Sequence, residues 1–345
     1  MTTAQGAPEA TQATPATLAT RATRATRATR ATRQGVHLGE AAAIAAGAIA
    51  LAAVLGPHEA QIAAMTAIFA LAGVGLNILV GYTGLVSLGH VVFFAIGAYG
   101  WARMTESGGV GLALVLPILV SLLVAALIVL VTLRVVGYYF GITTLAIGLL
   151  SVVVVQNATP ITGGYAGISG IQQIAVPGFA GPGQVLVMSG LVLAVAYYLQ
   201  SSLRESPLGA AMLATRFDVP ASQSLGLSVA WIRLLAFMIS SVPVTIAGAF
   251  LAQLVHYIGP DQMSLETSIR LIAIAIIGGR GWRWAPVLGA VVVVTLPELL
   301  RPLAEYRLVF YGVALAFVAL FMPRGLNQVV TWASGRIHAV RGSTG

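Results

Sequence analysis

The chain of 345 residues contains no lysine and no cysteine, and only 8% of its residues are charged. The absence of lysine excludes a phosphate-binding P-loop, because that motif needs a lysine to reach the β- and γ-phosphates. The absence of cysteine excludes disulfides, thiolate chemistry and cysteine-ligated metal sites. Soluble domains carry about 25% charged residues, so a chain with so few cannot cover a water-facing surface. A soluble protein with one very large core is the weaker alternative.

Long apolar runs dominate the chain: 58% of its residues are hydrophobic and its mean hydropathy is +0.93. Between positions 41 and 133 the only charged side chains are Glu59, Arg103 and Glu106. A membrane-spanning helix needs ~20 mainly apolar residues, so we expect an all-α polytopic integral membrane protein. About ten spans are predicted, near residues 41–56, 60–80, 88–102, 112–133, 138–156, 185–202, 231–253, 267–279, 286–301 and 306–322. Some of these runs are short, which leaves room for a broken or re-entrant helix.

The formal net charge of +8 would suit a nucleic-acid-binding protein, but the distribution of the arginines indicates a membrane protein. Membrane proteins concentrate their positive charge in cytoplasmic loops. With the N-terminus inside and ten alternating spans, four arginines fall outside (Arg103, Arg270, Arg301 and Arg307) and the other fourteen of the 18 fall inside. We therefore expect a multi-pass protein of the plasma (inner) membrane with both termini in the cytoplasm, and no nucleic-acid partner.

Three regions follow from composition: a tail at 1–36, a membrane domain at 37–327 and a cytoplasmic C-terminal tail at 328–345. The N-terminal tail has a three-residue repeat that carries five arginines: Arg21, Arg24, Arg27, Arg30 and Arg33. Such a composition cannot bury a core, so we expect a disordered basic tail. It either binds anionic lipid, at ~1 kcal/mol per arginine near the surface, or merely helps to fix orientation. The second interpretation is favoured.

The loop at 204–230 is the longest connection on the predicted cytoplasmic side. Ser206 and Pro207 predict a helix start, because serine caps free backbone N–H groups and proline suits the first helical position. Gly226 can end a following short helix. One face of the first helix is apolar, with Leu208, Met212 and Leu213. Such a helix either lies on lipid headgroups or docks into a groove on another protein.

A glycine-rich stretch at 73–97 contains polar side chains within an apolar region. Glycines there let helices approach closely or unwind, and close packing is the commoner role. His90 is either a hydrogen-bonded interior histidine or a substrate ligand, and the two threonines at 143 and 144 either bond their own helix or face the pathway. The candidate translocation-pathway residues are Asn77, Gly81, Tyr82, Gly84, Ser87, Gly89, His90, Gly97, Thr143 and Thr144.

Several motifs resemble one known family. The loop pattern Ser-Pro-x-Gly followed by Arg-x-Asp and Leu-Gly, at 206–226, is similar to the coupling loop of ABC-importer permeases for branched-chain amino acids. The stretch at 81–99 resembles the early membrane signature of that family, and residues 139–146 resemble an element typical of its LivM-type branch. The resemblance runs in order over about residues 60–327. It departs at 279–284, where Arg-Gly-Trp-Arg-Trp replaces smaller residues before a proline.

The resemblance implies a permease subunit that imports branched-chain or related amino acids by ATP-driven alternating access. It also implies an ATPase-coupling loop with Ser206, Pro207, Leu208, Gly209, Arg216, Asp218, Leu225 and Gly226. The implied partners are a second permease subunit (H-type, or a second copy), two ATP-binding subunits and a substrate-binding protein. The chain itself would be no enzyme and hold no cofactor, since the partners use the ATP.

Two alternatives stay open. A urea or short-chain amide permease of the same class shares these motifs. A stand-alone secondary transporter or channel would need no ATPase. Ion-coupled transporters carry chains of intramembrane ionisable residues, and this sequence offers no such chain, which disfavours the second alternative.

Overall fold

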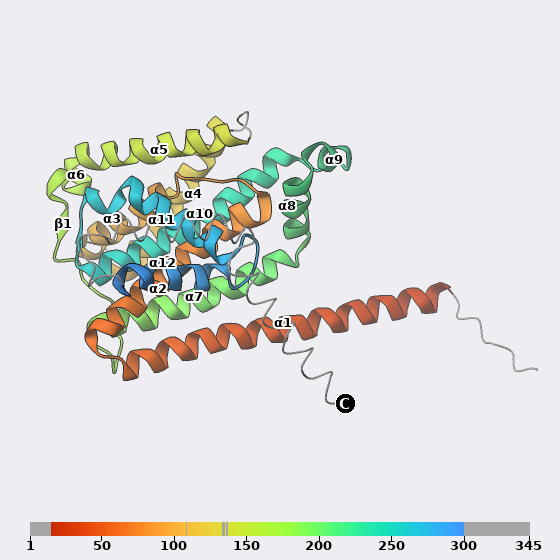
Figure 1. The fold of residues 1–345 in the computed structure, drawn as a ribbon, viewed down its shortest axis with the longest axis horizontal. Helices are drawn as coiled ribbons and strands as arrows, with labels where there is room; N and C mark the ends of the chain where they lie inside the picture. The colour runs from red at the N-terminus through yellow and green to blue at the C-terminus, as the bar shows by residue number, and fades with distance from the viewer. Residues whose placement is uncertain (1–14, 108, 133–134, 136, 300–345) are drawn as a thin grey trace, which may run out of the picture.

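The computed structural model describes residues 15–107, 109–132, 135 and 137–299, and these form a bundle of helices (Figure 1). The first half contains α1 (Pro15–Val54), α2 (Pro57–Leu76), the π-helix η1 (Asn77–Thr83), α3 (Val91–Ser107), α4 (Gly109–Thr132), α5 (Tyr138–Asn157), α6 (Thr159–Thr162), the 3₁₀ turn η2 (Gly164–Ala166) and β1 (Ile168–Ser169). The second half contains α7 (Pro182–Arg204), α8 (Pro207–Phe217), α9 (Val219–Ser224), α10 (Val229–Val255), β2 (Tyr257–Ile258), the 3₁₀ turn η3 (Pro260–Met263), α11 (Leu265–Gly278) and α12 (Ala285–Leu299).

Six helices in the described part of the chain are long and apolar enough to cross a membrane. They are Arg33–Val54 of α1, Pro57–Thr83 of α2 with η1, α4, Tyr139–Asn157 of α5, α7 and α10. The helices α3, α11 and α12 have 17, 14 and 15 residues, short of the ~20 that a full span needs. The predicted polytopic helical class is confirmed, while the predicted count of ten spans is not. The tenth span, 306–322, and the C-terminal tail lie outside the described residues.

The first span of the N-terminal region, Arg33–Val54, begins earlier than the predicted 41–56. A single helix of 40 residues, α1, runs from Pro15 to Val54, and its first part extends beyond the bundle (Figure 1). Alanine and arginine are strong helix formers, and elongating an existing helix costs far less than nucleating one. The apolar part of α1 packs along α7 and supplies the nucleus, so the helix continues backward through the repeat. Residues 1–14 lie outside the described part.

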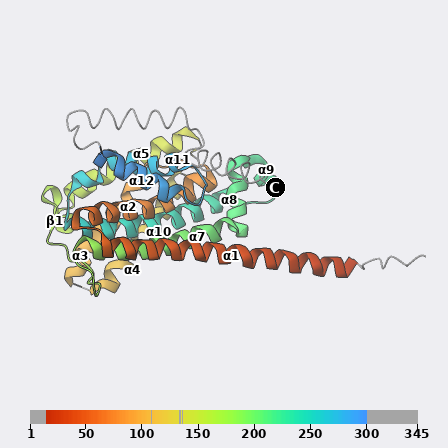
Figure 2. The same cartoon turned by 60° about the horizontal axis from the view of Figure 1, so that its bottom comes forward.

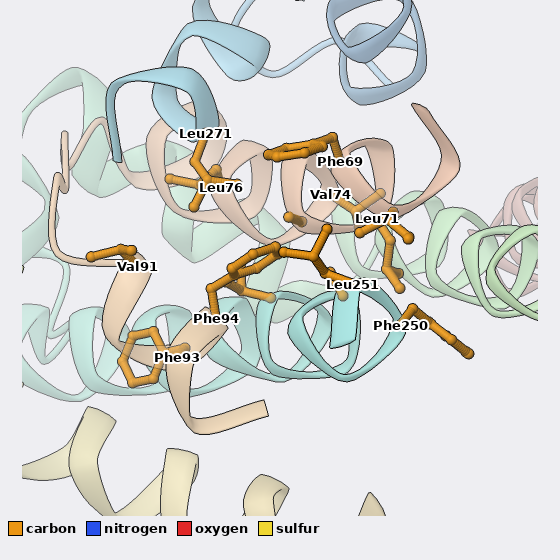
Figure 3. Packing of buried hydrophobic residues seen from close by; sticks show 14 of the residues in the cluster. Phe69, Leu71, Val74, Leu76, Val91, Phe93, Phe94, Phe250, Leu251 and Leu271 are labelled. Atoms are coloured by element: carbon orange, nitrogen blue, oxygen red, sulfur yellow. The ribbon is translucent and has the colours of Figure 1, made fainter. Parts of the chain in front are cut away.

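The core centres on α2, which lies between α7, α10 and α12 and contacts all three (Figure 2). Its side chains interlock with those of α3, α10 and α11, as Figure 3 shows for Phe69, Phe94 and Leu251. The rings of Phe69 and Phe94 stack with centroids 5.9 Å apart. Close packing of α3 on α10 depends on glycine, because a Cβ on Gly248 would collide with the carbonyl oxygen of Phe94. Lipid is as apolar as these side chains, so close van der Waals packing at small residues, rather than exclusion of water, holds the helices together.

The two ends of the bundle differ. At one end β1 and β2 form an antiparallel pair, with Ile168 opposite Ile258 and Ser169 opposite Tyr257. At the other end lie α8 and α9 (Figure 1). We call these the β end and the α8 end. The long loops at 157–184 and 204–230 therefore lie at opposite ends.

Candidate functional site

The chain between α2 and α3 forms a broken helix, residues 77–90, which we call the broken segment. It begins as the seven-residue π-helix η1, all of whose residues are buried. It then turns at Gly84, whose φ of 75° lies in the left-handed region that favours glycine, and runs without helix to His90. π-Helical turns are rare and frequently mark functional sites. Seven of the ten predicted pathway residues lie in this segment.

A loop at the α8 end holds the start of the broken segment. Residues 279–284, the hub loop, connect α11 to α12. The side chain of Asn77 donates from Nδ2 to the carbonyl oxygen of Trp282 at 2.9 Å and accepts from the N–H of Gly281 at 2.8 Å. A Cβ on Gly81 would lie only 2.6 Å from the nitrogen of Gly281. The predicted pathway residues Asn77 and Gly81 thus fix the hub loop against η1.

The predicted helix in the 204–230 loop is present as α8. Its N-cap is Ser206, whose Oγ accepts from the N–H of Gly209 at 3.1 Å, and Pro207 occupies the first turn. Asp218 caps the next helix, α9, by accepting from the N–H of Ala221 at 2.9 Å. Gly226, with φ of 79°, follows the end of α9. Serine, aspartate and glycine at these positions are typical helix caps; the sequence predicted the start of α8 from Ser206 and Pro207 and the end of α9 from Gly226, but not the cap at Asp218.

Two arginines of this loop point inward. Arg216, in the last turn of α8, donates from Nη1 to the carbonyl oxygen of Gly81 in η1. Arg204, the last residue of α7, donates from Nη1 to the carbonyl oxygen of Gly281 in the hub loop. Burial, and then the positive charges of Arg280 and Arg204, lower the pKa of the Arg216 guanidinium. Arg216 therefore lies in a partly buried, electropositive environment beside the broken segment.

The opposite side of the same loop is open and carries both apolar and polar side chains. Phe217 is 83% exposed and Leu225 is 78% exposed, whereas Met212 and Thr215 on the inner side of α8 are buried. Phe217 and Leu225 flank α9 and are the large apolar side chains that this side presents to solvent. We call residues 217–226 the outer face.

The second half of the broken segment is held by neutral hydrogen bonds. His90 lies 2.9 Å through Nδ1 from the hydroxyl of Ser87 and 3.0 Å through Nε2 from that of Ser240 on α10. The Ser240 hydroxyl gives its proton to the carbonyl oxygen of Phe237 at 2.8 Å. Nε2 must therefore carry the proton that Ser240 accepts, and Nδ1 accepts from Ser87. His90 is a neutral, fully bonded interior histidine, packed between the rings of Phe93 and Phe237 at 5.4 and 5.1 Å.

The first turns of α5 also contact the second half of the broken segment. The Thr144 hydroxyl accepts from the N–H of Leu88 at 3.2 Å, and a Cβ on Gly89 would lie 2.6 Å from the carbonyl oxygen of Thr144. Thr143 donates to the carbonyl oxygen of Tyr139 in its own helix at 2.8 Å. Of the two threonines, only Thr144 contacts the broken segment. Gly97 lies further along α3, against α10.

Three contacts were missed by reasoning from the sequence. The hydroxyl of Tyr82 donates to the carbonyl oxygen of Gln200 at 3.2 Å, and Ser240 and Gly281 bond His90 and Asn77. The three contacting residues, Gln200, Ser240 and Gly281, are far from the broken segment in sequence. The signals that could have found them are a Ser-Ser pair inside the apolar run of α10 and the glycines of the hub loop, of which Gly279 and Gly281 have positive φ.

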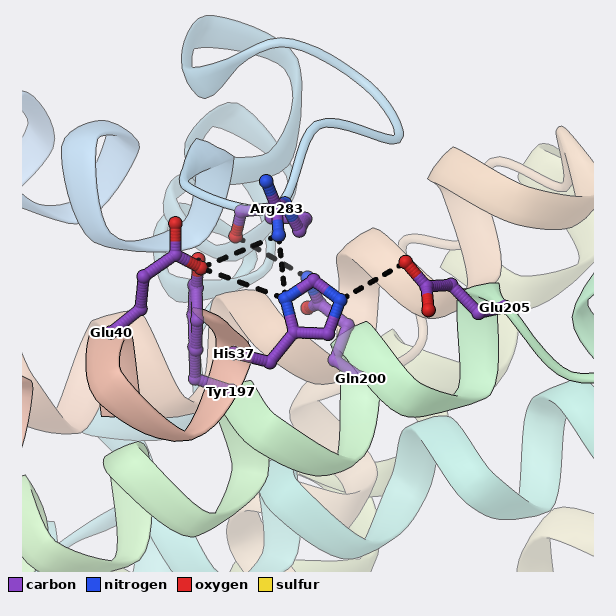
Figure 4. A network of polar contacts seen from close by, with 6 residues as sticks. All are labelled: His37, Glu40, Tyr197, Gln200, Glu205 and Arg283. Carbon is purple, nitrogen blue, oxygen red and sulfur yellow. Dashed lines mark hydrogen bonds and ion pairs between the residues drawn. The ribbon is translucent and has the colours of Figure 1, made fainter. Parts of the chain in front are cut away.

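A polar cluster joins α1 to the hub loop (Figure 4). His37, almost fully buried, lies 3.0 Å through Nε2 from Glu205 and 2.6 Å through Nδ1 from Arg283. Arg283 also pairs with Glu40 at 3.4 Å, and Glu40 accepts from the hydroxyl of Tyr197 at 2.8 Å. The ring of Trp284 packs on that of Tyr197 with centroids 5.0 Å apart. Two of the residues that depart from the family pattern, Arg283 and Trp284, thus pack against α1 and α7.

Together, six membrane-length helices, a broken helix in the core and a two-faced helical loop at one end define a polytopic membrane protein with the parts of a permease. The sequence profile of the branched-chain amino acid transport system permease components matches residues 60–319. The chain belongs to this family. No solved structure matches it.

Two curated relatives support the assignment. The high-affinity branched-chain amino acid transport system permease proteins LivM of Salmonella typhimurium and Escherichia coli are each 33% identical to the chain over 293 residues. In each case the match covers 77% of this chain and 69% of the relative. The family match begins at residue 60, so α1 lies outside it.

Proposed function

We propose that the chain is the membrane-spanning subunit of an ATP-driven importer for branched-chain or related amino acids. The observation that carries the proposal is the two-faced loop at the α8 end. Its outer face offers Phe217 and Leu225 to a partner, and its inner side contacts the broken segment through Arg216. Family membership and the names of the two LivM relatives supply the substrate class.

The arginine distribution supports placing the α8 end in the cytoplasm of an inner-membrane protein. Arg204, Arg216, Arg280 and Arg283 lie at that end, in accordance with the excess of positive charge in cytoplasmic loops. The chain has no P-loop lysine, so ATP is hydrolysed by partner subunits that dock on the cytoplasmic outer face. The same arginine distribution supports placing both termini in the cytoplasm.

Transport then proceeds by alternating access. Two ATPase subunits move α8, and the broken segment together with α3 and the start of α5 opens and closes the pathway. The loop at 157–184, at the β end, meets a substrate-binding protein on the outer side. A second permease subunit, either a related H-type chain or a second copy, completes the pathway.

Uptake and ATPase binding test this function together. The chain would be expressed with its neighbouring permease and ATPase subunits and reconstituted in vesicles with the binding protein. We expect uptake of leucine, isoleucine or valine that requires ATP. Uptake of urea or acetamide instead would change the substrate class, and uptake without any ATPase would replace the importer with a stand-alone transporter.

The outer face has its own test. Phe217→Ser with Leu225→Ser removes two exposed apolar side chains, and we expect at least about a tenfold loss of ATPase co-purification, as for truncated interface anchors. The matched control, Phe217→Leu with Leu225→Met, keeps the apolar character and should retain the ATPase. Equal ATPase recovery from both variants would place the docking surface elsewhere.

A further inference from the structure

The two inward-pointing arginines occupy a distinctive chemical position. The last carbonyl groups of a helix lack partners within the helix and attract cations. The carbonyl of Gly81 belongs to the last turn of η1, which ends at Thr83, and Arg216 donates to it. The carbonyl of Gly281 follows the end of α11 at Gly278, and Arg204 donates to it. Arg216 therefore caps the C-terminal end of η1, while Arg204 holds the hub loop just after the end of α11.

No carboxylate competes for these arginines. Among the described residues, neither Arg204 nor Arg216 forms an ion pair. Of the two acids in the same loop, Glu205 binds His37 at 3.0 Å and Asp218 caps α9. The arginines are thus bound by hydrogen bonds from a charged donor to neutral carbonyl oxygens, which are directional and stronger than neutral pairs. Such contacts can be broken and remade without separating an ion pair.

The end of η1 and the hub loop are themselves linked. Asn77 bonds both Gly281 and Trp282 of the hub loop. The side chain of Arg216 lies against both the broken segment and the hub loop. A Cβ added to Gly84 would lie 3.2 Å from the Cγ of Arg216, and a Cβ added to Gly281 would lie 3.2 Å from its Nη1. The loop that carries α8, the broken segment and the hub loop therefore form one connected unit at the α8 end.

The outer face and the arginines lie on different sides of this unit. Phe217 and Leu225 are open to a partner, whereas the guanidinium groups of Arg204 and Arg216 are used by backbone carbonyls inside the protein. A residue that binds internal backbone carbonyls contributes to the conformation of that backbone rather than to affinity for the partner.

We propose that Arg204 and Arg216 are positioning residues that transmit movement of α8 to the broken segment and the hub loop, and that they are not part of the ATPase-binding face. The proposal rests on the importer function proposed above. Displacing α8 withdraws Arg216 from the carbonyl of Gly81 and pulls on the adjoining Arg204, which releases the carbonyl of Gly281 in the hub loop. The broken segment can then rearrange while the ATPase stays bound at the outer face.

The test separates ATPase binding, ATP hydrolysis and uptake in the full complex. Arg216→Ala and Arg204→Ala are each reconstituted with the permease, ATPase and binding-protein partners. We expect each variant to keep its ATPase and to hydrolyse ATP, while uptake per ATP hydrolysed falls about tenfold, within the range of coupling between sites. Arg216→Lys, which keeps a cationic donor, should recover much of that ratio.

The control is Arg270→Gln, at the β end, where the arginine pairs with Glu266 at 2.8 Å on the surface. It should leave uptake per ATP unchanged, because exposed pairs of this kind contribute little. Gel filtration and thermal unfolding in detergent identify variants that do not fold. If Arg216→Ala is unstable, Arg216→Lys and Arg204→Ala decide the question.

Each outcome has a distinct meaning. Loss of the ATPase from a folded Arg216→Ala variant would place Arg216 on the binding face and overturn the inference, while the importer function stands. Wild-type uptake per ATP in both alanine variants would also overturn it. If the wild-type chain neither binds an ATPase nor needs ATP, the proposed function fails, whatever the arginines do.

Discussion

Two helical segments of equal length cross the bundle, but one stays α-helical throughout and the other does not. The segments Pro57–Thr83 and Val229–Val255 each have 27 residues, and each contains an 18-residue window of mean hydropathy 2.1. The second, α10, contains Pro243 yet continues as one α-helix. The first contains no proline after Pro57, yet its last seven residues become a π-helix and the chain then leaves helical geometry.

The comparison shows that proline content does not decide where a membrane helix breaks. Proline is tolerated in membrane helices because neighbouring groups satisfy the freed backbone. The end of α2 leaves helical geometry at Gly84, and distant residues hold it there: Asn77 bonds the hub loop and Arg216 binds the carbonyl of Gly81. Four substitutions test this difference between α10 and α2 with η1, in order of expected effect.

Gly248→Ala in α10 should have the largest effect. The added Cβ collides with the backbone of Phe94, which cannot move without separating α3 from α10. We expect a loss of about 3 kcal/mol in the free energy of unfolding, at the upper end for overpacking. Unfolding in mixed micelles measures it. The control Gly47→Ala, whose Cβ meets nothing within 4 Å, should be nearly neutral, and similar stability of the two would contradict the tight α3–α10 contact.

Gly81→Ala should come next. Its Cβ would lie 2.6 Å from the nitrogen of Gly281, so η1 and the hub loop must separate. The expected cost is about 2 kcal/mol, accompanied by a fall in ATP-driven uptake. Gly141→Ala, with its nearest neighbour 3.6 Å away at the carbonyl of Val86, is the matched control. Unchanged uptake in Gly81→Ala would show that the contact with the hub loop is dispensable.

Asn77→Ala should cost about 1.5 kcal/mol, because it leaves the N–H of Gly281 and the carbonyl of Trp282 without their partner. Hydrogen exchange of the hub loop should rise, since its link to η1 is lost. Asn157→Ala removes a hydrogen bond to the carbonyl of Val153 in an exposed part of α5 and should change stability by less than about 0.5 kcal/mol. Equal exchange in the hub loop of wild type and Asn77→Ala would refute the link.

Pro243→Ala in α10 should have the smallest effect. The helix is already continuous there, and its neighbours stabilise it. We expect a change within about 1 kcal/mol in either direction, and uptake close to wild type. A large loss of uptake with normal folding would show that α10, like the broken segment, moves during transport.

Much of the fold could be predicted from composition and caps. The absence of charge between Glu59 and Arg103 predicts membrane helices in this interval, because irregular backbone exposed to lipid would leave polar groups unsatisfied. The start of α8 and the end of α9 were predicted because Ser206 and Gly226 act on backbone groups only a few residues away, whereas the cap that Asp218 provides for α9 was not predicted. The broken segment was flagged by its glycines and polar side chains, although the sequence could not say which of them would bond.

The site could not be assembled in the same way. Thr143 and Thr144 are adjacent and chemically alike, and only packing shows that Thr144 holds Leu88 while Thr143 bonds its own helix. The length of α1 was not predicted, because the composition of the repeat at its start cannot form a buried core and so predicted disorder. Its helix depends on the packing of the following residues against α7 and on the cluster of His37, Glu40 and Arg283.

The sequence by itself determined that this chain is a helical membrane protein, which family it belongs to and where its first loop helix begins and its second ends, since these depend on composition and on contacts a few residues apart. Only the tertiary structure decided which helix breaks, which arginines point inward and what the hub loop holds. Those outcomes depend on hydrogen bonds between residues more than a hundred positions apart, such as Asn77 with Gly281 and Arg216 with Gly81. Only folding brings such groups within bonding distance.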